Sequence, residues 1–397
     1  MQQIPNPFRS VAVLSGKGGT GKSIITASLG YILAKCGFKT LLVDADLFTG
    51  GLTFYSLAEH PRHLPIALQN LFLSDSSLDA AHFRSISIPN KFAEGKLFLL
   101  PALASKTPHR SELLINTQFQ SIERFSSTLR DIIRSVAVKE EVEYVIVDTR
   151  GGTDLTSVGT TLVVDGFIVV TEADKTSWDV GEVLFDAVRE ASHSDGPSAE
   201  AFGFIINKNV LPTESIVAFL RQRWQCPHLA TVPLDENAIR YYQQDKVPVV
   251  EDIECPFSSA LVPVVRRLFV NESWKSENLA VLVELEKAAH LGEIRRSSNV
   301  RKVNRTERAS ITLKIYGTAL SVILLLGVAI QTMVASSNES THGFNVFVPI
   351  FVSILIFTMT GSDPKMIERI INIANFLKLT RKRTFKQSSK STKKRSK

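Results

Sequence analysis

Short apolar runs alternate with longer helix-compatible stretches from about residue 11 to residue 291. Each run is short and almost wholly apolar, as is typical of parallel strands that helices cover on both faces. The pattern predicts an α/β fold with a doubly wound, mostly parallel sheet. In the less regular region from Thr53 to Lys96 we expect only helices and loops. The runs are Val11–Leu14, Thr40–Val43, Leu97–Leu100, Tyr144–Val147, Phe167–Val170, Phe202–Ile206 and Leu229–Val232.

The C-terminal quarter has a different pattern, with two long apolar segments. Residues 315–334 and residues 344–362 contain no charged side chain, and the polar residues 335–343 separate them. About 20 residues of helix cross a hydrocarbon layer of about 30 Å. A pair of buried core helices is the alternative, but both segments are uncharged on every side and lie between basic clusters. We therefore predict a two-helix transmembrane hairpin.

Charge divides the chain at the same place. The formal net charge of +7 combines residues 1–294, with 27 Lys and Arg against 35 Asp and Glu, and residues 295–397, with 19 against 4. The first part has a net charge of −8 and the second a net charge of +15. The total therefore describes an acidic α/β domain with a basic C-terminal part, and it does not indicate a nucleic-acid-binding globule.

Charge also predicts the orientation of the hairpin. The loop between the two segments has no Lys or Arg, whereas residues 295–314 have seven and the stretch from Asp363 onward has twelve. By the positive-inside rule, both ends lie in the cytoplasm. We expect a multi-pass protein of the inner (cytoplasmic) membrane, with the α/β domain in the cytoplasm.

Two segments after the hairpin keep more than one interpretation. Residues 363–379 include an amphipathic helix, which either lies on the inner membrane surface or packs on the α/β domain. Residues 380–397 form a basic tail that we expect to be disordered. Its charge suits anionic lipid; a contact with nucleic acid and a merely solvated tail are the alternatives.

Cysteine usage and the N-terminus fit a cytoplasmic domain. The three cysteines, Cys36, Cys226 and Cys255, form no C-x-x-C motif, so they support neither a disulfide framework nor a zinc site. The sequence MQQIPNPFRS has no basic segment followed by an apolar stretch of the length of a signal peptide.

A glycine-rich motif follows the first predicted strand and opens a helix. Residues 15–23, SGKGGTGKS, match G-x-x-x-x-G-K-[ST] in the context that this phosphate-binding loop requires. Its glycines allow consecutive backbone N–H groups to face a phosphate. We expect Lys22 to reach the β- and γ-phosphates and the Ser23 hydroxyl to bind Mg²⁺. The remaining predicted nucleotide-binding residues of the loop are Gly16, Gly18, Gly19, Thr20 and Gly21.

A second lysine inside the loop, Lys17, makes the motif resemble the deviant Walker A motif of the MinD/ParA ATPases, a P-loop group of the SIMIBI class. The resemblance covers roughly Arg9 to Phe269. Several further segments resemble the family's motifs in the family's order: 41–46 (switch I), 98–102, 144–152 (Walker B and switch II), and 205–208 and 232–235 (nucleobase loops). It implies ATP as the nucleotide and Mg²⁺ as the metal.

The resemblance assigns further roles. Asp148 would hold Mg²⁺, the N–H of Gly151 or Gly152 would sense the γ-phosphate, and Asp46 would orient or activate the attacking water. Asp44 would support Asp46 or the Mg²⁺ shell; helix capping is the alternative for both aspartates. Asn207 would bond the adenine edge, and Pro233 would pack near the ring.

Lys17 implies more than hydrolysis. In the MinD/ParA family this lysine reaches across a nucleotide-dependent dimer to the partner's phosphates. We therefore expect an ATP-dependent homodimer, with Lys17, Lys22 and Asp46 as catalytic residues. Arg150 departs from the family pattern, and phosphate, a partner, Asp154 or solvent are equally open as its surroundings.

The sequence thus predicts a membrane-anchored ATPase that recruits, positions or regulates an unidentified partner protein. A membrane-associated tyrosine kinase of the polysaccharide type is one alternative, but such kinases end in a tyrosine cluster and the tail here has no tyrosine. A nucleotide-binding scaffold without hydrolysis is the other. Iron–sulfur carriers are excluded because they need paired interface cysteines.

Overall fold

The computed structural model describes residues 8–56, 67–73, 84–89, 94–103, 121–195 and 199–296. The chain divides into two units, Met1–Arg296 and Ser297–Lys397, two residues beyond the boundary that the sequence predicts. The predicted spans, amphipathic helix and tail lie outside the described residues, as does the basic linker except Arg295 and Arg296. Within the described ranges, no helix combines the length and the apolar character that a membrane span requires.

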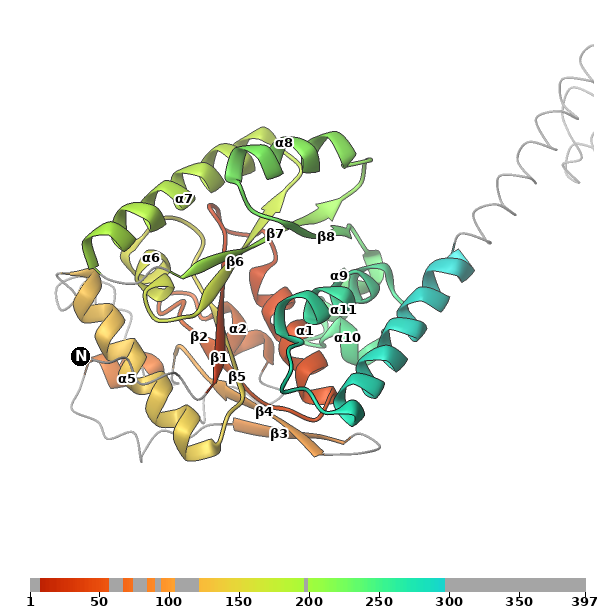
Figure 1. The fold of residues 1–397 in the computed structure, drawn as a ribbon, viewed down its shortest axis with the longest axis horizontal. Coiled ribbons are helices and arrows are strands. Elements are labelled where there is room, and N and C mark those ends of the chain that lie inside the picture. The colour runs from red at the N-terminus through yellow and green to blue at the C-terminus, as the bar shows by residue number, and fades with distance from the viewer. Residues whose placement is uncertain are drawn as a thin grey trace, which may run out of the picture. The chain divides into compact units, whose positions relative to one another are not determined.

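A central sheet carries the fold, and its eight described strands lie in the order β3-β4-β2-β5-β1-β6-β7-β8 (Figure 1). Seven of them run parallel, and β3 pairs antiparallel with β4 at one edge. All seven predicted runs lie within the parallel strands, which confirms the predicted α/β class. The strands are β1 (Arg9–Leu14), β2 (Lys39–Asp44), β3 (Arg84–Pro89), β4 (Glu94–Leu100), β5 (Tyr144–Asp148), β6 (Gly166–Glu172), β7 (Glu200–Asn209) and β8 (His228–Pro233).

Strand β3 corrects the prediction for the region from Thr53 to Lys96. That region was expected to hold only helices and loops, yet it contains β3 and the start of β4 beside two short helices. The residues of β3, RSISIP, alternate serine and isoleucine with the period of two that an edge strand requires, and proline stands at its end. The alternating pattern is present in the sequence but covers only six residues, and this segment becomes a strand by pairing with β4.

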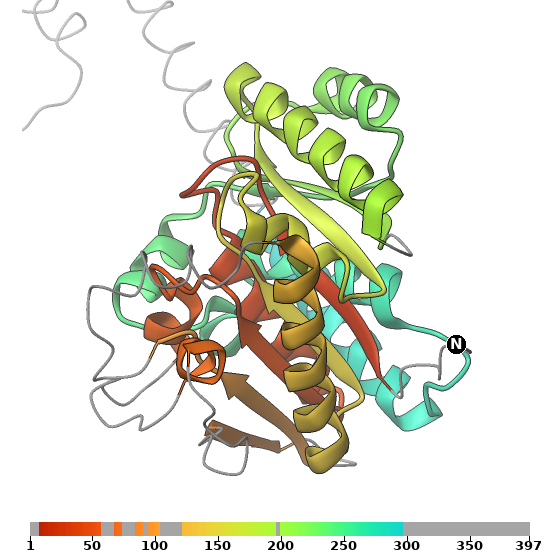
Figure 2. The same cartoon turned by 90° about the vertical axis from the view of Figure 1, so that its left-hand side faces the viewer.

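Helices cover both faces of the sheet (Figures 1 and 2). Alternate residues of β1 belong to different cores: Ala12 and Leu14 pack with α5, α7 and α8, whereas Val11 and Val13 pack with α1 and α11. The helices are α1 (Lys22–Lys35), α2 (Gly51–Ser56), α3 (Leu68–Leu73), α5 (Ile122–Glu140), α6 (Leu155–Thr161), α7 (Lys175–Asp195), α8 (Glu214–Trp224), α9 (Glu236–Gln243), α10 (Pro248–Glu251), α11 (Pro256–Phe269) and a last helix over residues 276–296.

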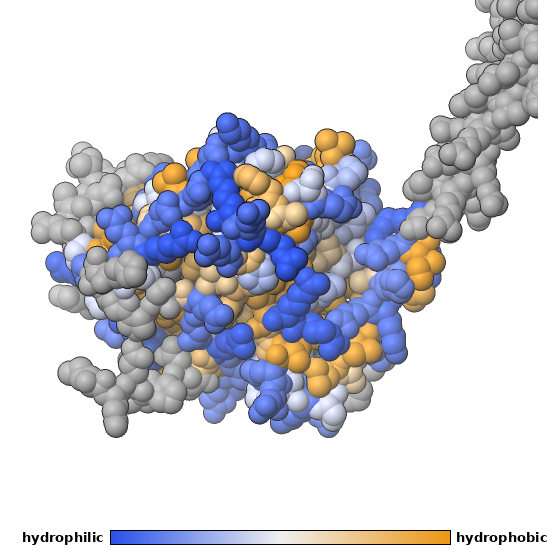
Figure 3. All heavy atoms as spheres, turned by 45° about the horizontal axis from the view of Figure 1, so that its top comes forward, coloured by the Kyte–Doolittle hydropathy of each residue, from blue (hydrophilic) through white to orange (hydrophobic). Residues whose placement is uncertain are grey.

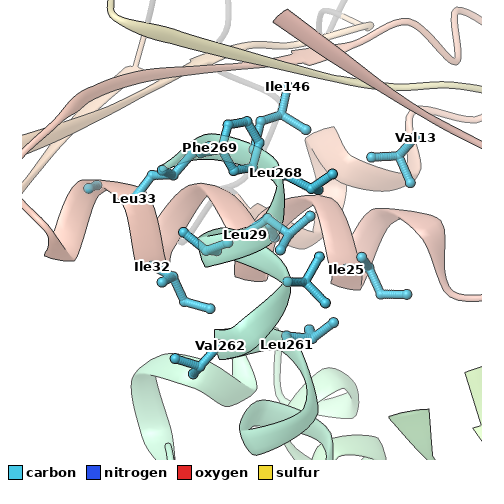
Figure 4. Packing of buried hydrophobic residues seen from close by; sticks show 14 of the residues in the cluster. Val13, Ile25, Leu29, Ile32, Leu33, Ile146, Leu261, Val262, Leu268 and Phe269 are labelled. Carbon is cyan, nitrogen blue, oxygen red and sulfur yellow. The ribbon is translucent and has the colours of Figure 1, made fainter. Parts of the chain in front are cut away.

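Helix α1 is fixed on several sides. Figure 4 shows apolar side chains of α1, among them Leu29 and Leu33, packed with Leu268 and Phe269 of α11. At its C-terminal end, Asn278 of the last helix donates its amide to the carbonyl oxygen of Cys36 over 2.6 Å. Because the glycine-rich loop leads directly into α1, this packing also fixes the loop.

The outer surface of the domain is mixed. On the face in Figure 3, polar side chains predominate and hydrophobic residues form patches between them. Among the exposed large hydrophobic side chains are Val210, at 74% exposed, and Val138, at 59%. Single exposed apolar residues of this kind are ordinary in folded proteins.

We predict that Leu29→Ala lowers the free energy of unfolding by about 3 kcal/mol, because the cavity left behind cannot be refilled in so closed a core. The exposed Val138→Ala should change it by less than about 0.5 kcal/mol. Urea unfolding followed by tryptophan fluorescence measures both, since Trp178, Trp224 and Trp274, the three tryptophans of the chain, all lie in this domain. Equal losses in the two variants would contradict the packing described.

Candidate functional site

A cavity of about 720 Å³ opens at the carboxyl ends of the parallel strands. Such edges are where open α/β sheets bind ligands. The glycine-rich loop and switch segments line one part of the cavity, and the ends of β7 and β8 with the residues after β8 line another. The predicted residues among its lining are Gly18, Gly19, Gly21, Lys22, Ser23, Asp46, Gly151, Asn207 and Pro233.

The loop has the shape of a phosphate cradle. A Cβ atom added at Gly18 or Gly19 would meet no atom within 4 Å, so the cavity has room beside both backbones. Gly21 has φ +91°, and a Cβ there would lie 2.3 Å from Nδ2 of Asn207. Both the left-handed backbone and the close neighbour require glycine at this position. Lys22 is buried, and its Nζ donates to Oγ of Ser15 over 2.9 Å.

Two other predicted glycines allow close backbone contacts, Gly16 with helix α7 and Gly151 with the glycine-rich loop. A Cβ on Gly16 would lie 2.5 Å from the backbone of Val180, and one on Gly151 would lie 2.5 Å from that of Lys17. The N–H of Gly152 donates to the carbonyl oxygen of Ser15 over 2.9 Å. Of the two candidates for sensing the γ-phosphate, Gly151 lines the cavity, whereas the N–H of Gly152 already has an acceptor.

Ser23 and Asp148 form the candidate metal position. The Ser23 hydroxyl donates to Oδ2 of Asp148 over 2.6 Å, and Thr26 donates to Oδ1 over 3.4 Å. Within the described ranges, no group of three or more His, Cys, Asp or Glu side chains is placed to hold a metal ion. Proteins nevertheless often supply only one or two ligands to Mg²⁺, such as one carboxylate and one hydroxyl, and phosphate and water supply most of the others. The donor set therefore fits the predicted metal.

Burial shifts the pKa values of this centre. Desolvation raises the pKa of Asp148 to about 6, against the opposing effects of the Lys22 charge and the Ser23 hydrogen bond. Desolvation also lowers the pKa of Lys22, although the nearby Asp148 and Asp46 oppose that change. Burial makes the charged forms of both Asp148 and Lys22 unfavourable. A bound polyanion would compensate the charge of Lys22, and its cation would compensate the charge of Asp148.

The two switch I aspartates differ in their surroundings. Asp44 is fully buried and accepts hydrogen bonds from the backbone N–H and the hydroxyl of Thr53, over 2.7 and 2.6 Å, and from the N–H of Asp46. These contacts hold α2, so the geometry favours the capping alternative for Asp44. Asp46 lines the cavity, and its carboxylate accepts hydrogen bonds from the backbone N–H and the hydroxyl of Thr49.

Lys17 is the loop lysine that is not among the residues lining the cavity. Its Nζ lies 2.8 Å from Glu172 at the end of β6 and 3.1 Å from Asp174. The hydrogen bond to Glu172 raises the pKa of Lys17 despite partial desolvation. Lys208 pairs with the same Glu172 over 2.9 Å and also donates to the carbonyl oxygen of Gly19. Ion pairs thus hold Lys17 within its own chain.

The predicted nucleobase residues lie together at the other part of the cavity. Asn207 is buried and donates its Nδ2 to the carbonyl oxygen of Thr20 over 2.7 Å. It therefore braces the glycine-rich loop as well as lining the cavity. Thr20 is buried and joins the site through this backbone oxygen, and Pro233 ends β8 at the cavity wall.

Arg150 lies over the ring of Phe48, with 4.7 Å from its guanidinium carbon to the ring centre, and 4.0 Å from Asp154. It also lines the cavity. The sequence left phosphate, a partner, Asp154 and solvent open as neighbours of Arg150, and the structure places Arg150 beside Asp154.

Sequence reasoning missed several lining residues. Thr49 stands three residues after the switch I segment, so proximity to a motif was its only signal, whereas Lys208 lies inside the predicted nucleobase segment 205–208 but had no role assigned to it. Ile239 and Tyr242 of α9 belong to no motif and enter the site only through folding.

Comparison with known proteins identifies the domain. Residues 11–160 match the family model described as the CobQ/CobB/MinD/ParA nucleotide binding domain. The chain contains a nucleotide-binding domain of this type. The matched residues include the glycine-rich loop and Asp46, which contribute to the lining of the cavity, and the buried Asp44 and Asp148.

Full-length relatives agree with this domain. The septum site-determining protein MinD of Escherichia coli (strain K12) is 24% identical over 275 residues, which cover 66% of this chain and 92% of that protein. The chromosome partitioning protein ParA of Caulobacter vibrioides is 22% identical over 272 residues, covering 67% and 96%. The chain is a homologue of these proteins and an ATPase.

A solved structure has the same fold. The structure of MinD from Pyrococcus horikoshii OT3, complexed with Mg-ADP, superposes with a TM-score of 0.51 at 21% identity and covers 66% of this chain and 96% of that one.

We predict a pH-dependent effect of Asp148→Asn. Because burial raises the pKa of Asp148 above that of the unfolded chain, the folded protein keeps this proton longer, and ionisation between about pH 4 and pH 6 costs stability. Without nucleotide or Mg²⁺, the variant should be about 1–3 kcal/mol more stable than the wild type at pH 8, and the difference should vanish near pH 4.

Urea midpoints from pH 4 to pH 8 in the presence of a chelator measure this difference. The exposed Asp131→Asn on α5 is the matched control and should follow the wild type throughout. An Asp148→Asn variant that is no more stable at pH 8 would contradict the assigned cost of burial.

Proposed function

We propose that this chain hydrolyses Mg-ATP and uses the resulting switch to recruit, position or regulate a partner complex at a membrane. One observation carries the proposal: Lys22, Ser23 and Asp46 line one cavity, with Asp148 bonded to Ser23, and Asn207 and Pro233 line the same cavity. The Mg-ADP in the Pyrococcus horikoshii MinD structure supports this choice of nucleotide and metal.

The residues divide the chemistry among them. Lys22 supplies positive charge to the phosphates from a buried position, where the charge acts strongly. Ser23 and Asp148 would hold Mg²⁺, which would supply positive charge to the phosphates. Asp46 would orient the attacking water, and the backbone N–H of Gly151 would be available to the γ-phosphate. Thr49 holds the Asp46 carboxylate in place.

We further propose that ATP drives dimerisation through Lys17. In the structure Lys17 is paired with Glu172 and Asp174 of its own chain. In the dimer it would exchange these carboxylates for the phosphates bound by the partner. Both ion pairs are partly exposed, so each is worth at most about 1 kcal/mol and a phosphate group can displace them.

Membrane anchoring through residues 315–334 and 344–362 is part of the proposal. It is supported by the absence of charge from both segments and by the Lys and Arg residues on either side of the pair. The names of the relatives refer to septum placement and chromosome partitioning, both of which are positioning tasks. We propose a positioning or gating role for this chain on that ground, with its protein partner unidentified.

Hydrolysis is tested with Asp46. We predict that Asp46→Ala lowers kcat at least about 100-fold while the dissociation constant for ATP changes less than about threefold, because the carboxylate acts on water. Asp46→Asn keeps an acceptor for Thr49 and should lose turnover equally. Lys22→Ala should instead abolish ATP binding. Steady-state hydrolysis and calorimetric ATP binding by the full chain measure these effects; wild-type protein that binds ATP without turnover would refute the proposal.

Dimerisation is tested with Lys17 and its partner. Lys17→Ala should abolish ATP-dependent self-association in sedimentation experiments. Glu172→Gln should strengthen it up to about fivefold, because one ion pair that holds Lys17 within its own chain is removed. Unchanged association of Lys17→Ala would exclude this residue from the dimer contact.

Anchoring is tested by extraction of cell membranes with alkaline carbonate. The full chain should stay in the pellet. Leu325→Arg at the centre of the first predicted span should raise the cost of insertion by about 3 kcal/mol and release part of the protein. Leu211→Asp, at an exposed site of the ATPase domain, should leave the pellet fraction unchanged. Release of the wild type would show that the segments do not span the membrane.

A further inference from the structure

The cavity has an apolar wall that the predicted nucleotide residues do not explain. Leu234, Ile239 and Tyr242 all line it, and they are 49%, 43% and 47% exposed. Ile239 and Tyr242 stand three residues apart on α9, so they lie on one side of that helix. A single exposed apolar residue is ordinary, but three on one wall of a ligand cavity indicate a surface that a ligand covers.

The wall belongs to the nucleoside part of the cavity. Leu234 directly follows Pro233, and Asn207 lines the same cavity from the end of β7. The groups suited to phosphate come instead from the glycine-rich loop after β1 and from Lys22, the first residue of α1. A nucleobase and its ribose are the less charged part of ATP, and they are the part that gains from contact with side chains of this kind.

Tyr242 is held in place by a second tyrosine. Its ring lies 4.8 Å from the ring of Tyr55, centre to centre, with 39° between the planes. Tyr55 is 3% exposed, and its hydroxyl donates to the carbonyl oxygen of Lys246 over 2.7 Å. The buried ring and this hydrogen bond tie α2 to the segment that follows α9. Tyr242 therefore meets the cavity from a supported position and loses little further freedom on binding.

We propose that Tyr242 contacts the nucleoside of bound ATP and that Tyr55 is the positioning residue that holds its ring. The proposal rests on the proposed function and adds to it a residue that sets affinity for the nucleoside rather than for the phosphates.

Binding of two probes to the full chain tests the assignment. Tyr242→Ala should weaken binding of Mg-ATP about fivefold, the effect of losing one aromatic contact, while binding of inorganic triphosphate changes less than about twofold. Tyr242→Phe keeps the ring and should bind both probes like the wild type. Tyr55→Phe loses the hydrogen bond to Lys246 and should weaken ATP binding about twofold.

Tyr241→Ala is the matched control. Tyr241 is the next residue on α9, and its ring packs with Arg240, 5.4 Å away. This variant should bind both probes like the wild type. Urea unfolding of each variant, followed by tryptophan fluorescence, shows whether the domain is intact.

Several results would overturn the proposal. ATP binding of Tyr242→Ala that equals the wild type would show that the ring does not meet the nucleoside, and equal weakening for ATP and triphosphate would show a general effect on the cavity. Normal ATP affinity with altered self-association would assign the wall to a second copy of the chain. Failure of the wild type to bind ATP would instead refute the proposed function, so the two failures are distinguishable.

Discussion

The parallel pairing of β1 between β5 and β6 determines where each charged group of the site lies. The register sets Val13 of β1 beside Asp148 at the end of β5, and β6 ends in Glu172 on the other side of β1. The glycine-rich loop leaves β1 between these acidic positions. Its two lysines separate accordingly: the charge of Lys22 acts on Asp148, and Lys17 pairs with Glu172. Moving β1 by one strand in either direction would leave it beside only one of β5 and β6, and so beside only one of these acidic positions.

Burial makes this arrangement costly in the absence of a ligand. Asp44 and Asp148 are register partners at the ends of β2 and β5, and both are buried. Desolvation raises the pKa of each, and the neighbouring charge of Asp148 raises the pKa of Asp44 further. Thr53 satisfies Asp44 within the chain, whereas Asp148 has two hydroxyl neighbours and Lys22 nearby. In the proposed function a cation with phosphate would offset the cost of burying Asp148, and binding would relieve unfavourable electrostatics that the folded chain already contains.

The phosphate and nucleoside parts of the cavity share one support. Helix α2 begins just after Asp46 and Thr49, and Thr53 on this helix holds Asp44. Two residues later in the chain, Tyr55 packs on Tyr242 of α9. Helix α2 therefore links the buried Asp44 to the apolar wall of the cavity at Tyr242.

Much of this molecule follows from local sequence. Seven apolar runs predicted the parallel strands, because strands buried on both faces must be apolar throughout. The loop of residues 15–23 predicted its own phosphate site, because glycines and the following helix determine that geometry locally. Tertiary structure alone decided the rest. Capping by Asp44, the pairing of Lys17 with Glu172, the bracing of Thr20 by Asn207 and the wall at Tyr242 join residues far apart in the chain, and β3 became a strand only beside β4. Such contacts depend on strand order and register, which no local pattern encodes.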